Sequence, residues 1–298
     1  MTTTRVAVPR KGRPLEAVLE RLAARTGTTE LADDIISTLR YEKSVTKGDQ
    51  SADGDIYDRL AAYSELDDPT EPEFTLLRDD REGMPRRVVF DSVTVPTAHG
   101  SVQLVGREEP FRALRTHEFA LGFDSADLVL EEVVQLRDDP LRTIGEINER
   151  IDPLDTDVRV VTGLGDTVYH TLLATPAVTD TQDRPLDREF VAGYEGEFCI
   201  SPRYERLVEA VLGTAALTDI TFTYPGDAAE EEADVAATGI GVYLTVTGST
   251  ARQFDLVLGE QLFPSETVLL ENASERTETT ERVAQLFADP EETAVPTV

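Results

Sequence analysis

The segment Val242-Tyr-Leu-Thr-Val-Thr-Gly-Ser-Thr-Ala-Arg252 contains the signals of a buried strand, a tight turn and a helix, in that order. Apolar and β-branched residues predict the strand at 240–246, and the pattern of residues 251–258 predicts the helix. Similar strand and helix signals alternate through most of the chain, without an internal repeat. This alternation predicts an α/β protein with mainly parallel sheets and two lobes.

The turn in this segment has the composition of a phosphate-binding loop. Gly248 lets the backbone turn sharply, so that neighbouring N–H groups and hydroxyls point into one concavity at the positive end of a helix. Arg252 adds a cation of the type that binds phosphate. We therefore expect an anion site at Thr247, Gly248, Ser249, Thr250 and Arg252. The alternative is an ordinary strand-to-helix turn with Thr or Ser as N-cap.

A second basic turn lies near the start of the chain. A strand at Arg5–Val8 is followed by Pro9-Arg-Lys-Gly-Arg13, and Pro14 begins a helix that ends at Gly27. In α/β folds ligands bind at the carboxyl ends of strands, where both turns are expected. Lys11 is one of only three lysines in the chain. That scarcity favours a second phosphate-facing loop over the alternative of a solvated basic loop.

The composition is strongly acidic. The 298 residues include 58 Asp and Glu against 28 Lys and Arg, for a formal net charge of -30. Few lysines, abundant carboxylates and the absence of Trp are typical of a halophilic protein in a salt-rich cytosol, where salt screens the self-repulsion. The chain has no basic stripe for nucleic acid and no apolar run near the ~18 residues of a membrane span. Without a secretory signal, it is expected to be soluble and cytoplasmic.

Several kinds of chemistry find no support in the sequence. Cys199 lies in an apolar strand signal, so we expect a buried, inert thiol. His99, His117 and His170 show no ligand spacing and are interpreted as structural or surface residues. No Ser-His-Asp arrangement or metal-ligand cluster stands out.

Residues 28–85 are the least informative part of the chain. They predict helices at 31–39 and 56–66, with an exposed loop at 46–55 between them. Further along, helices are predicted at 126–136 and 141–149. Asp127 and Glu131 would then share one helix face at a spacing of four residues.

Taken together, several short segments resemble the ATP phosphoribosyltransferase family, the first enzyme of histidine biosynthesis. The resemblance covers roughly residues 3–27, 103–136 and 198–288, in family order. The matching segments are Arg5–Arg13, Arg107-Glu-Glu-Pro110, Leu121-Gly122 with Asp127 and Glu131, Ser201-Pro-Arg-Tyr204, Glu230, Thr247–Arg252 and Val268–Ser274.

The resemblance implies a two-lobed fold like that of periplasmic binding proteins, with a central cleft. Lobe I would span 1–136 with an insertion at about 28–102, lobe II would span 137–270 with the phosphate loop, and 271–298 would return to lobe I and end in an acidic tail. No C-terminal regulatory domain is expected after the last helix, so feedback through one is not expected either.

The family activity is transfer of phosphoribosyl from phosphoribosyl pyrophosphate to N1 of ATP, with magnesium and release of pyrophosphate. Carried over by motif, the catalytic residues would be Glu230 and Arg252. The substrate-binding residues would be Lys11, Gly12, Arg13, Arg107, Gly122, Asp127, Glu131, Arg203, Thr247, Gly248, Ser249 and Thr250. Metal ligands cannot be assigned from the sequence.

The chain departs from the family at its acidic positions. Gly239, Tyr243 and Val246 stand where the family has carboxylates that serve the ribose hydroxyls and magnesium. In the first lobe Ala120 replaces an aspartate, and Asp124-Ser125 replace Thr-Gly. Hence the alternative is a catalytically weakened paralogue that binds a phosphorylated metabolite, as a sensor or as a subunit of a partner enzyme. Instead of joining a partner enzyme, the chain could form a homo-oligomer.

Overall fold

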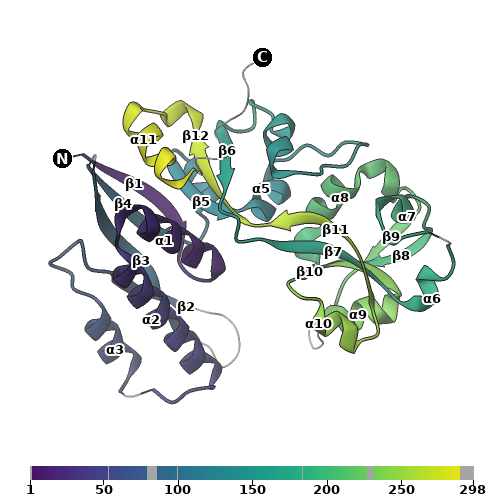
Figure 1. The fold of residues 1–298 in the computed structure, drawn as a ribbon, viewed down its shortest axis with the longest axis horizontal. Helices are drawn as coiled ribbons and strands as arrows, with labels where there is room; N and C mark the ends of the chain where they lie inside the picture. The colour runs from purple at the N-terminus through teal and green to yellow at the C-terminus, as the bar shows by residue number, and fades with distance from the viewer. Residues whose placement is uncertain are drawn as a thin grey trace. The chain divides into compact units, whose positions relative to one another are not determined.

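The computed structural model describes residues 2–52, 54–78, 86–98, 100–182, 184–226 and 231–288 (Figure 1). The chain forms two compact units. Unit 1 consists of Met1–Asp124, Asp157–Asp166 and Thr267–Val298, and unit 2 consists of Ser125–Thr156 and Thr167–Glu266. The structure therefore groups residues 125–136 with unit 2 and residues 157–166 and 267–270 with unit 1, whereas the sequence analysis assigned them to the opposite lobes.

Across its described residues, unit 1 holds a seven-stranded mixed sheet in the order β2-β3-β4-β1-β5-β12-β6. The strands are β1 (Thr3–Pro9), β2 (Glu73–Arg78), β3 (Arg86–Thr97), β4 (Gly100–Arg107), β5 (Leu121–Ser125), β6 (Val158–Gly163) and β12 (Thr267–Asn272). β1 runs parallel to β4 and β5, while β3 pairs antiparallel with β2 and β4, and β12 pairs antiparallel with β6. β3 and β4 are consecutive in the chain and pair as a hairpin, and His99 lies outside the described residues.

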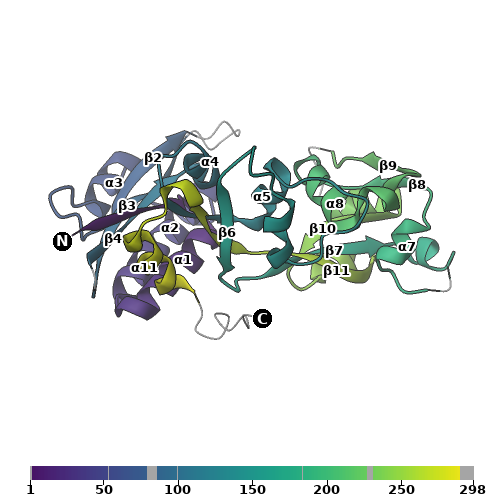
Figure 2. The ribbon, with the colours of Figure 1, turned by 90° about the horizontal axis from the view of Figure 1, so that it is seen from above.

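Helices cover both faces of the unit 1 sheet (Figure 2). They are α1 (Arg13–Thr26), α2 (Thr29–Lys47), α3 (Ile56–Tyr63), α4 (Pro110–Arg115) and α11 (Glu278–Phe287), with the 3₁₀ turn η4 (Ala273–Glu275). β1 alternates between the two faces. Val6 and Val8 pack into the core beneath α1, α2 and α11, and Ala7 points to the opposite face, against Gly122 and the α4 side. Because β1 is buried on both faces, it anchors both helix layers.

The first helix follows the sequence prediction closely. Leu15, Val18 and Leu22 form its buried stripe, as their helical spacing requires. Its last turn ends at Gly27, which adopts a left-handed conformation with φ 75° and donates its N–H to the carbonyl of Ala23. Each fully buried Leu or Val contributes about 1.5–3 kcal/mol to folding.

Unit 2 holds a five-stranded mixed sheet in the order β11-β7-β10-β8-β9 across the residues that are described. The strands are β7 (Val168–Ala174), β8 (Gly196–Cys199), β9 (Ile220–Thr223), β10 (Ile240–Thr245) and β11 (Val257–Ser265). The helices are α5 (Ala126–Glu132), α6 (Pro176–Thr179), α7 (Arg188–Ala192), α8 (Glu205–Leu212), α9 (Glu231–Thr238) and α10 (Ser249–Gln253), with 3₁₀ turns η1 (Ile144–Arg150), η2 (Pro202–Tyr204) and η3 (Thr214–Leu217). β10, the strand of the opening segment, is central: it pairs antiparallel with β7 and parallel with β8.

The α/β class is confirmed, but both sheets are mixed where mainly parallel sheets were expected. The helix predicted at 251–258 is wrong beyond its first turn. α10 ends at Gln253, Asp255 adopts a left-handed backbone with φ 55°, and Val257–Ser265 forms β11. β11 hydrogen-bonds antiparallel to β7, and this long-range ladder overrides the local pattern.

Three smaller boundaries also differ from the prediction. The helix expected at 141–149 is the 3₁₀ turn η1, the helix expected at 126–136 ends at Glu132, and α2 continues into the loop expected at 46–55. α2 stops at Gly48, whose φ of 79° ends the helix in a left-handed cap.

Candidate functional site

The turn between β1 and α1 presents the positive end of a helix. β1 ends at Pro9, and α1 begins at Arg13, with Gly12 as the preceding cap residue. Gly12 has φ 81° and ψ -176°, a conformation that side chains with a Cβ rarely adopt. α1 is 14 residues long, so the dipole at its N-terminus favours an anion at this end.

A hollow of about 450 Å³ lies against this turn, entirely within unit 1. Five cationic side chains line it: Lys11, Arg13, Arg40, Lys43 and Arg87. They come from three separate elements, the β1–α1 turn, α2 and β3. The lining contains one carboxylate, Glu16, and two apolar side chains, Leu39 and Val88. The chain as a whole is acidic, with a net charge of -30, so a hollow lined mainly by charged groups of positive sign contrasts with its overall composition. We call this hollow the basic pocket.

Contacts within unit 1 hold part of the basic pocket in place. Arg13 donates a hydrogen bond to the backbone carbonyl of Asp166, and its guanidinium lies 3.6 Å from the carboxylate of the same residue. Asp166 also accepts hydrogen bonds from the backbone N–H and the hydroxyl of Thr267, at 2.8 and 2.7 Å. Arg40 Nη2 lies 2.6 Å from Glu16 Oε2, joining α2 to the first turn of α1. The pocket wall is therefore tied to the start of β12 and to α1.

The sequence analysis found two of the five cations and missed three. Lys11 and Arg13 were predicted from the β1–α1 turn, together with Gly12, and the structure places all three in the basic pocket. Arg40, Lys43 and Arg87 lie in the segment that was least informative. One signal could have drawn attention to them: Lys43 is the second of only three lysines in the chain.

The predicted phosphate loop of unit 2 is closed by its own hydrogen bonds. The hydroxyl of Thr247 lies 3.1 Å from Ser249 Oγ and accepts the backbone N–H of Ser249 at 3.4 Å. Arg252 donates to the carbonyl of Thr247 at 3.1 Å. Thr247 and Ser249 are exposed, and Thr250 is half-buried. α10, which follows, has five residues, so its dipole is small compared with that of α1.

Gly248 is required in this loop for two reasons. Its φ of 66° lies in the left-handed region, and a Cβ at this position would lie 2.4 Å from Cδ2 of Leu258. Leu258 belongs to β11, so the loop packs directly on the edge strand of the unit 2 sheet. Gly248 thus permits both the turn and its close approach to the sheet.

Tyr243, at one of the positions where a family carboxylate is absent, has acidic neighbours in space. Tyr243, on β10, has its pKa raised to about 12, first by burial and then by Glu231 and Glu232 at the start of α9. The Tyr243 hydroxyl is also hydrogen-bonded to Glu231. Two carboxylates therefore lie near a position where the family has one. The predicted catalytic Glu230 lies outside the described residues.

Asp127 and Glu131 lie on α5, as predicted, and both contact protein groups of unit 2. Asp127 is buried; its Oδ2 accepts the Ser265 hydroxyl at 2.7 Å, and its Oδ1 lies 3.3 Å from Nε2 of the buried His170. Glu131 accepts the backbone N–H of Leu207 in the first turn of α8 at 2.7 Å. Burial, the largest cause, raises the pKa of Glu131. These contacts support packing of α5 against its neighbours.

The remaining predicted residues occupy separate places. Arg107 lies over the Phe119 ring at 4.9 Å and 3.5 Å from the Glu118 carboxylate. Gly122 is buried, and a Cβ there would lie 2.6 Å from Leu114. Arg203 lies over the ring of Tyr204 at 5.6 Å. None of these three is among the residues that line the basic pocket.

The thiol, His117 and His170 fit the structural or surface roles expected for them. Cys199 is buried, and burial is the main cause that raises its pKa, which keeps the thiol protonated and unreactive. His117 Nδ1 lies 3.0 Å from Glu275 at the surface. Within the described part of the chain, no group of three or more His, Cys, Asp or Glu side chains is arranged to hold a metal ion.

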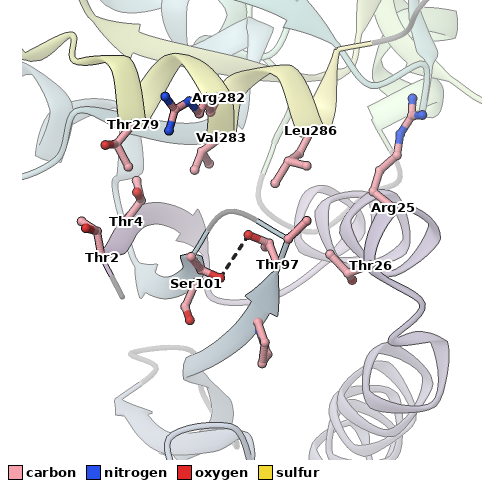
Figure 3. A pocket seen from close by; sticks show the side chains of 13 residues that line it. Thr2, Thr4, Arg25, Thr26, Thr97, Ser101, Thr279, Arg282, Val283 and Leu286 are labelled. Carbon is pink, nitrogen blue, oxygen red and sulfur yellow. Dashed lines mark hydrogen bonds between the residues drawn. The ribbon is translucent and has the colours of Figure 1, made fainter.

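A second hollow of unit 1, of about 400 Å³, has several hydroxyl-bearing residues in its lining (Figure 3). Its hydroxyl-bearing residues are Thr2, Thr4, Thr26, Thr97, Ser101 and Thr279. The two arginines on its rim already contact α11 or the residue after it: Arg282 pairs with Glu278, and Arg25 donates to the carbonyl of Ala288 at 3.4 Å. α1 begins at the basic pocket and ends here, so the two hollows lie at opposite ends of that helix.

These features define an α/β protein of two units with a cation-lined hollow at the carboxyl end of a strand. The chain belongs to the halobacterial ATP phosphoribosyltransferase family, whose model matches residues 1–297. No curated protein matches the sequence. Among the described residues, no helix combines the length and the apolar character needed to cross a bilayer.

Solved structures provide distant likenesses. One is the ATP phosphoribosyl transferase (HisG:HisZ) complex from Thermotoga maritima, at 13% identity and TM-score 0.43, covering 95% of this chain and 93% of that one. YhfZ from Shigella flexneri matches at 8% identity and TM-score 0.44, covering 97% and 85%. The periplasmic VFT2 domain of BvgS from Bordetella pertussis matches at 11% identity and TM-score 0.37, covering 99% and 88%.

Proposed function

We propose that this protein transfers phosphoribosyl from phosphoribosyl pyrophosphate to N1 of ATP and releases pyrophosphate, as a step of histidine biosynthesis. Membership of the family supports the reaction. The single structural observation that carries the proposal is the basic pocket, because both substrates and the leaving group carry linked phosphates. Its five cations and the N-terminus of α1 provide the charge that such ligands need.

The chemistry places opposite demands on the two sides of the reacting carbon. A bond forms between the purine nitrogen and the anomeric carbon, and the bond from that carbon to pyrophosphate breaks with its electron pair. Negative charge grows on the departing pyrophosphate, and donors or cations in place before the reaction stabilise it. We assign the 5-phosphate of the sugar to the amides and hydroxyls of 247–250, with Arg252 bracing the loop through the carbonyl of Thr247.

Magnesium remains part of this proposal only as an ion carried by the substrates. The described residues do not provide a three-ligand metal site. Mg²⁺ commonly binds substrate phosphates with one or two carboxylates and several waters. Glu231 and Glu232, near Tyr243, are the acidic side chains we assign to the ribose side of unit 2.

A second candidate function is binding without efficient catalysis, as a sensor or as a subunit of a partner enzyme. The observation that favours it is the loss of carboxylates at Gly239, Tyr243 and Val246. A charged hydrogen bond to a ribose hydroxyl contributes about 1.5–3 kcal/mol, so several losses lower the rate by orders of magnitude. Under either function we propose a cytoplasmic protein suited to high salt, acting on small molecules as a homo-oligomer or with a partner subunit.

The test is a direct assay in molar potassium chloride with magnesium, ATP and phosphoribosyl pyrophosphate, following phosphoribosyl-ATP by absorbance. We expect measurable transfer that is slower than the ~10 s⁻¹ of an ordinary enzyme. Lys11→Met should lower it strongly, and the matched control Arg282→Met, on the rim of the other hollow, should not. Binding of both substrates without turnover would favour the second candidate. Neither binding nor turnover would refute both.

A further inference from the structure

Helix α2 turns a cationic face towards the basic pocket. Arg40, Lys43 and Thr46 line the pocket at successive spacings of three residues, which places them on one side of the helix. Arg40 and Lys43 are largely exposed, and Leu39 beside them is buried in the core. α2 belongs to residues 28–102, a segment to which the sequence analysis assigned no role.

A neighbouring side of α2 is fixed to the rest of unit 1. Glu42, which is 2% exposed, accepts two hydrogen bonds from Arg59 at 2.7 and 2.9 Å and one from the Tyr63 hydroxyl at 2.9 Å. Arg59 and Tyr63 both lie on α3. These bonds hold α2 to α3, so Arg40 and Lys43 project from a fixed helix and lose less entropy on binding a ligand.

The cations of the pocket are spread over more than one element. Lys11 and Arg13 lie at the β1–α1 turn, Arg40 and Lys43 lie on α2, and Arg87 lies on β3. Linked phosphates offer oxygens at several positions along a chain, so one ligand can contact cations on more than one of these elements. The volume of about 450 Å³ lies within the range of about 300–1,000 Å³ that is usual for small-molecule sites.

At high salt, an exposed cation must contact the ligand directly to contribute to binding. At 1 M salt the Debye length is about 3 Å, so an exposed cation that does not touch the ligand contributes little attraction. The exposed pair of Arg40 with Glu16 is worth only about 0–1 kcal/mol, so a phosphate oxygen can compete for the guanidinium. The two α2 cations are therefore positioned to contribute through contact with the ligand.

We propose that α2 forms one wall of a polyphosphate subsite, in which Arg40 and Lys43 bind the distal phosphates of a linear chain of at least three. Lys11, Arg13 and the N-terminus of α1 bind the proximal phosphate, and Arg87 completes the wall from β3. The subsite selects ligands by the number of linked phosphates. Naming ATP as the natural ligand rests on the proposed transferase function; binding of the phosphate chain does not.

Isothermal calorimetry in 2 M potassium chloride tests this with inorganic tripolyphosphate, pyrophosphate and phosphate as probes. The wild type should bind tripolyphosphate tightest and phosphate weakest. Arg40→Gln with Lys43→Met should weaken tripolyphosphate binding roughly 100-fold or more, as expected for the loss of two charged hydrogen bonds that each contribute a factor of about 10 to 100, and change phosphate binding less than about 3-fold. Arg282→Met is the matched control and should change neither. A thermal melt of each variant verifies that it folds.

Equal affinity of the wild type for the three probes would overturn the proposal. So would an unchanged affinity of the double variant for tripolyphosphate, or an equal loss for all three probes. The transferase assay is independent. If transfer to ATP fails while the length dependence and the variant effect hold, the subsite stands and only the assignment of ATP is lost.

Discussion

Replacing Glu42 by glutamine removes a buried negative charge while keeping the side-chain volume. In the native protein the carboxylate of Glu42 binds both ends of the Arg59 fork and the Tyr63 hydroxyl. The Glu42 side chain is 2% exposed and that of Arg59 is 12% exposed, so little water can replace the lost contacts. Breaking one partner of a buried ion pair costs about 3–5 kcal/mol. Because glutamine retains some hydrogen bonding, we expect a loss of about 2–4 kcal/mol in the free energy of unfolding.

Glu16, on α1, provides a matched control. Glu16 pairs with Arg40, whose side chain is 63% exposed, and Glu16→Gln should cost about 1 kcal/mol or less. Urea unfolding of each variant, followed by circular dichroism in 1 M and 3 M potassium chloride, gives the comparison. The Glu42 effect should persist at the higher salt because the pair is buried, whereas the smaller Glu16 effect should shrink.

A double-mutant cycle gives the sharper result. Replacing Glu42 by leucine and Arg59 by methionine together should recover much of the stability lost by either change alone, because the double variant leaves no unpaired charge. A loss below about 1 kcal/mol for Glu42→Gln, or additive effects in the cycle, would refute the claim that this buried cluster fixes α2 to α3.

Three further predictions concern the loop, the pH dependence and the salt dependence. Gly248→Asp should abolish binding of phosphoribosyl pyrophosphate by charge and by collision with Leu258, and calorimetry showing unchanged affinity would remove the ligand from this loop. The pKa values of Tyr63 and Tyr243 are raised to about 12, mainly by burial, from the ordinary value of about 10. The contribution of these two tyrosines to stability is therefore complete below pH 10 and should be lost as the pH rises to about 12. Tyrosinate absorbance at 295 nm should rise over the same pH range. A free energy of unfolding that does not change with pH in this range would contradict the prediction. The melting temperature should rise between about 0.1 M and 2 M potassium chloride as salt screens the net charge of -30, and a flat response would count against a halophilic protein.

Local signals in the sequence determined the first strand, turn and helix of unit 1. Pro14 at the start of α1, the apolar stripe through Leu22 and the terminal Gly27 are all short-range features, and each acts within one or two turns of chain. For the same reason the sequence identified Lys11 as a candidate ligand contact, and the structure places it in the basic pocket. The burial of Cys199 also followed from its apolar strand.

Only the tertiary structure determined which residues far apart in the sequence come together in space. Val257–Ser265 became a strand because β7 offered it a hydrogen-bonding partner, which a local pattern cannot reveal. Asp127 meets Ser265 across 138 positions of sequence, so its burial depended on how α5 packs. Arg40, Lys43 and Arg87 reach the β1–α1 turn from two other elements. A pocket is a property of several elements brought together in space, and sequence periodicity describes only one element at a time.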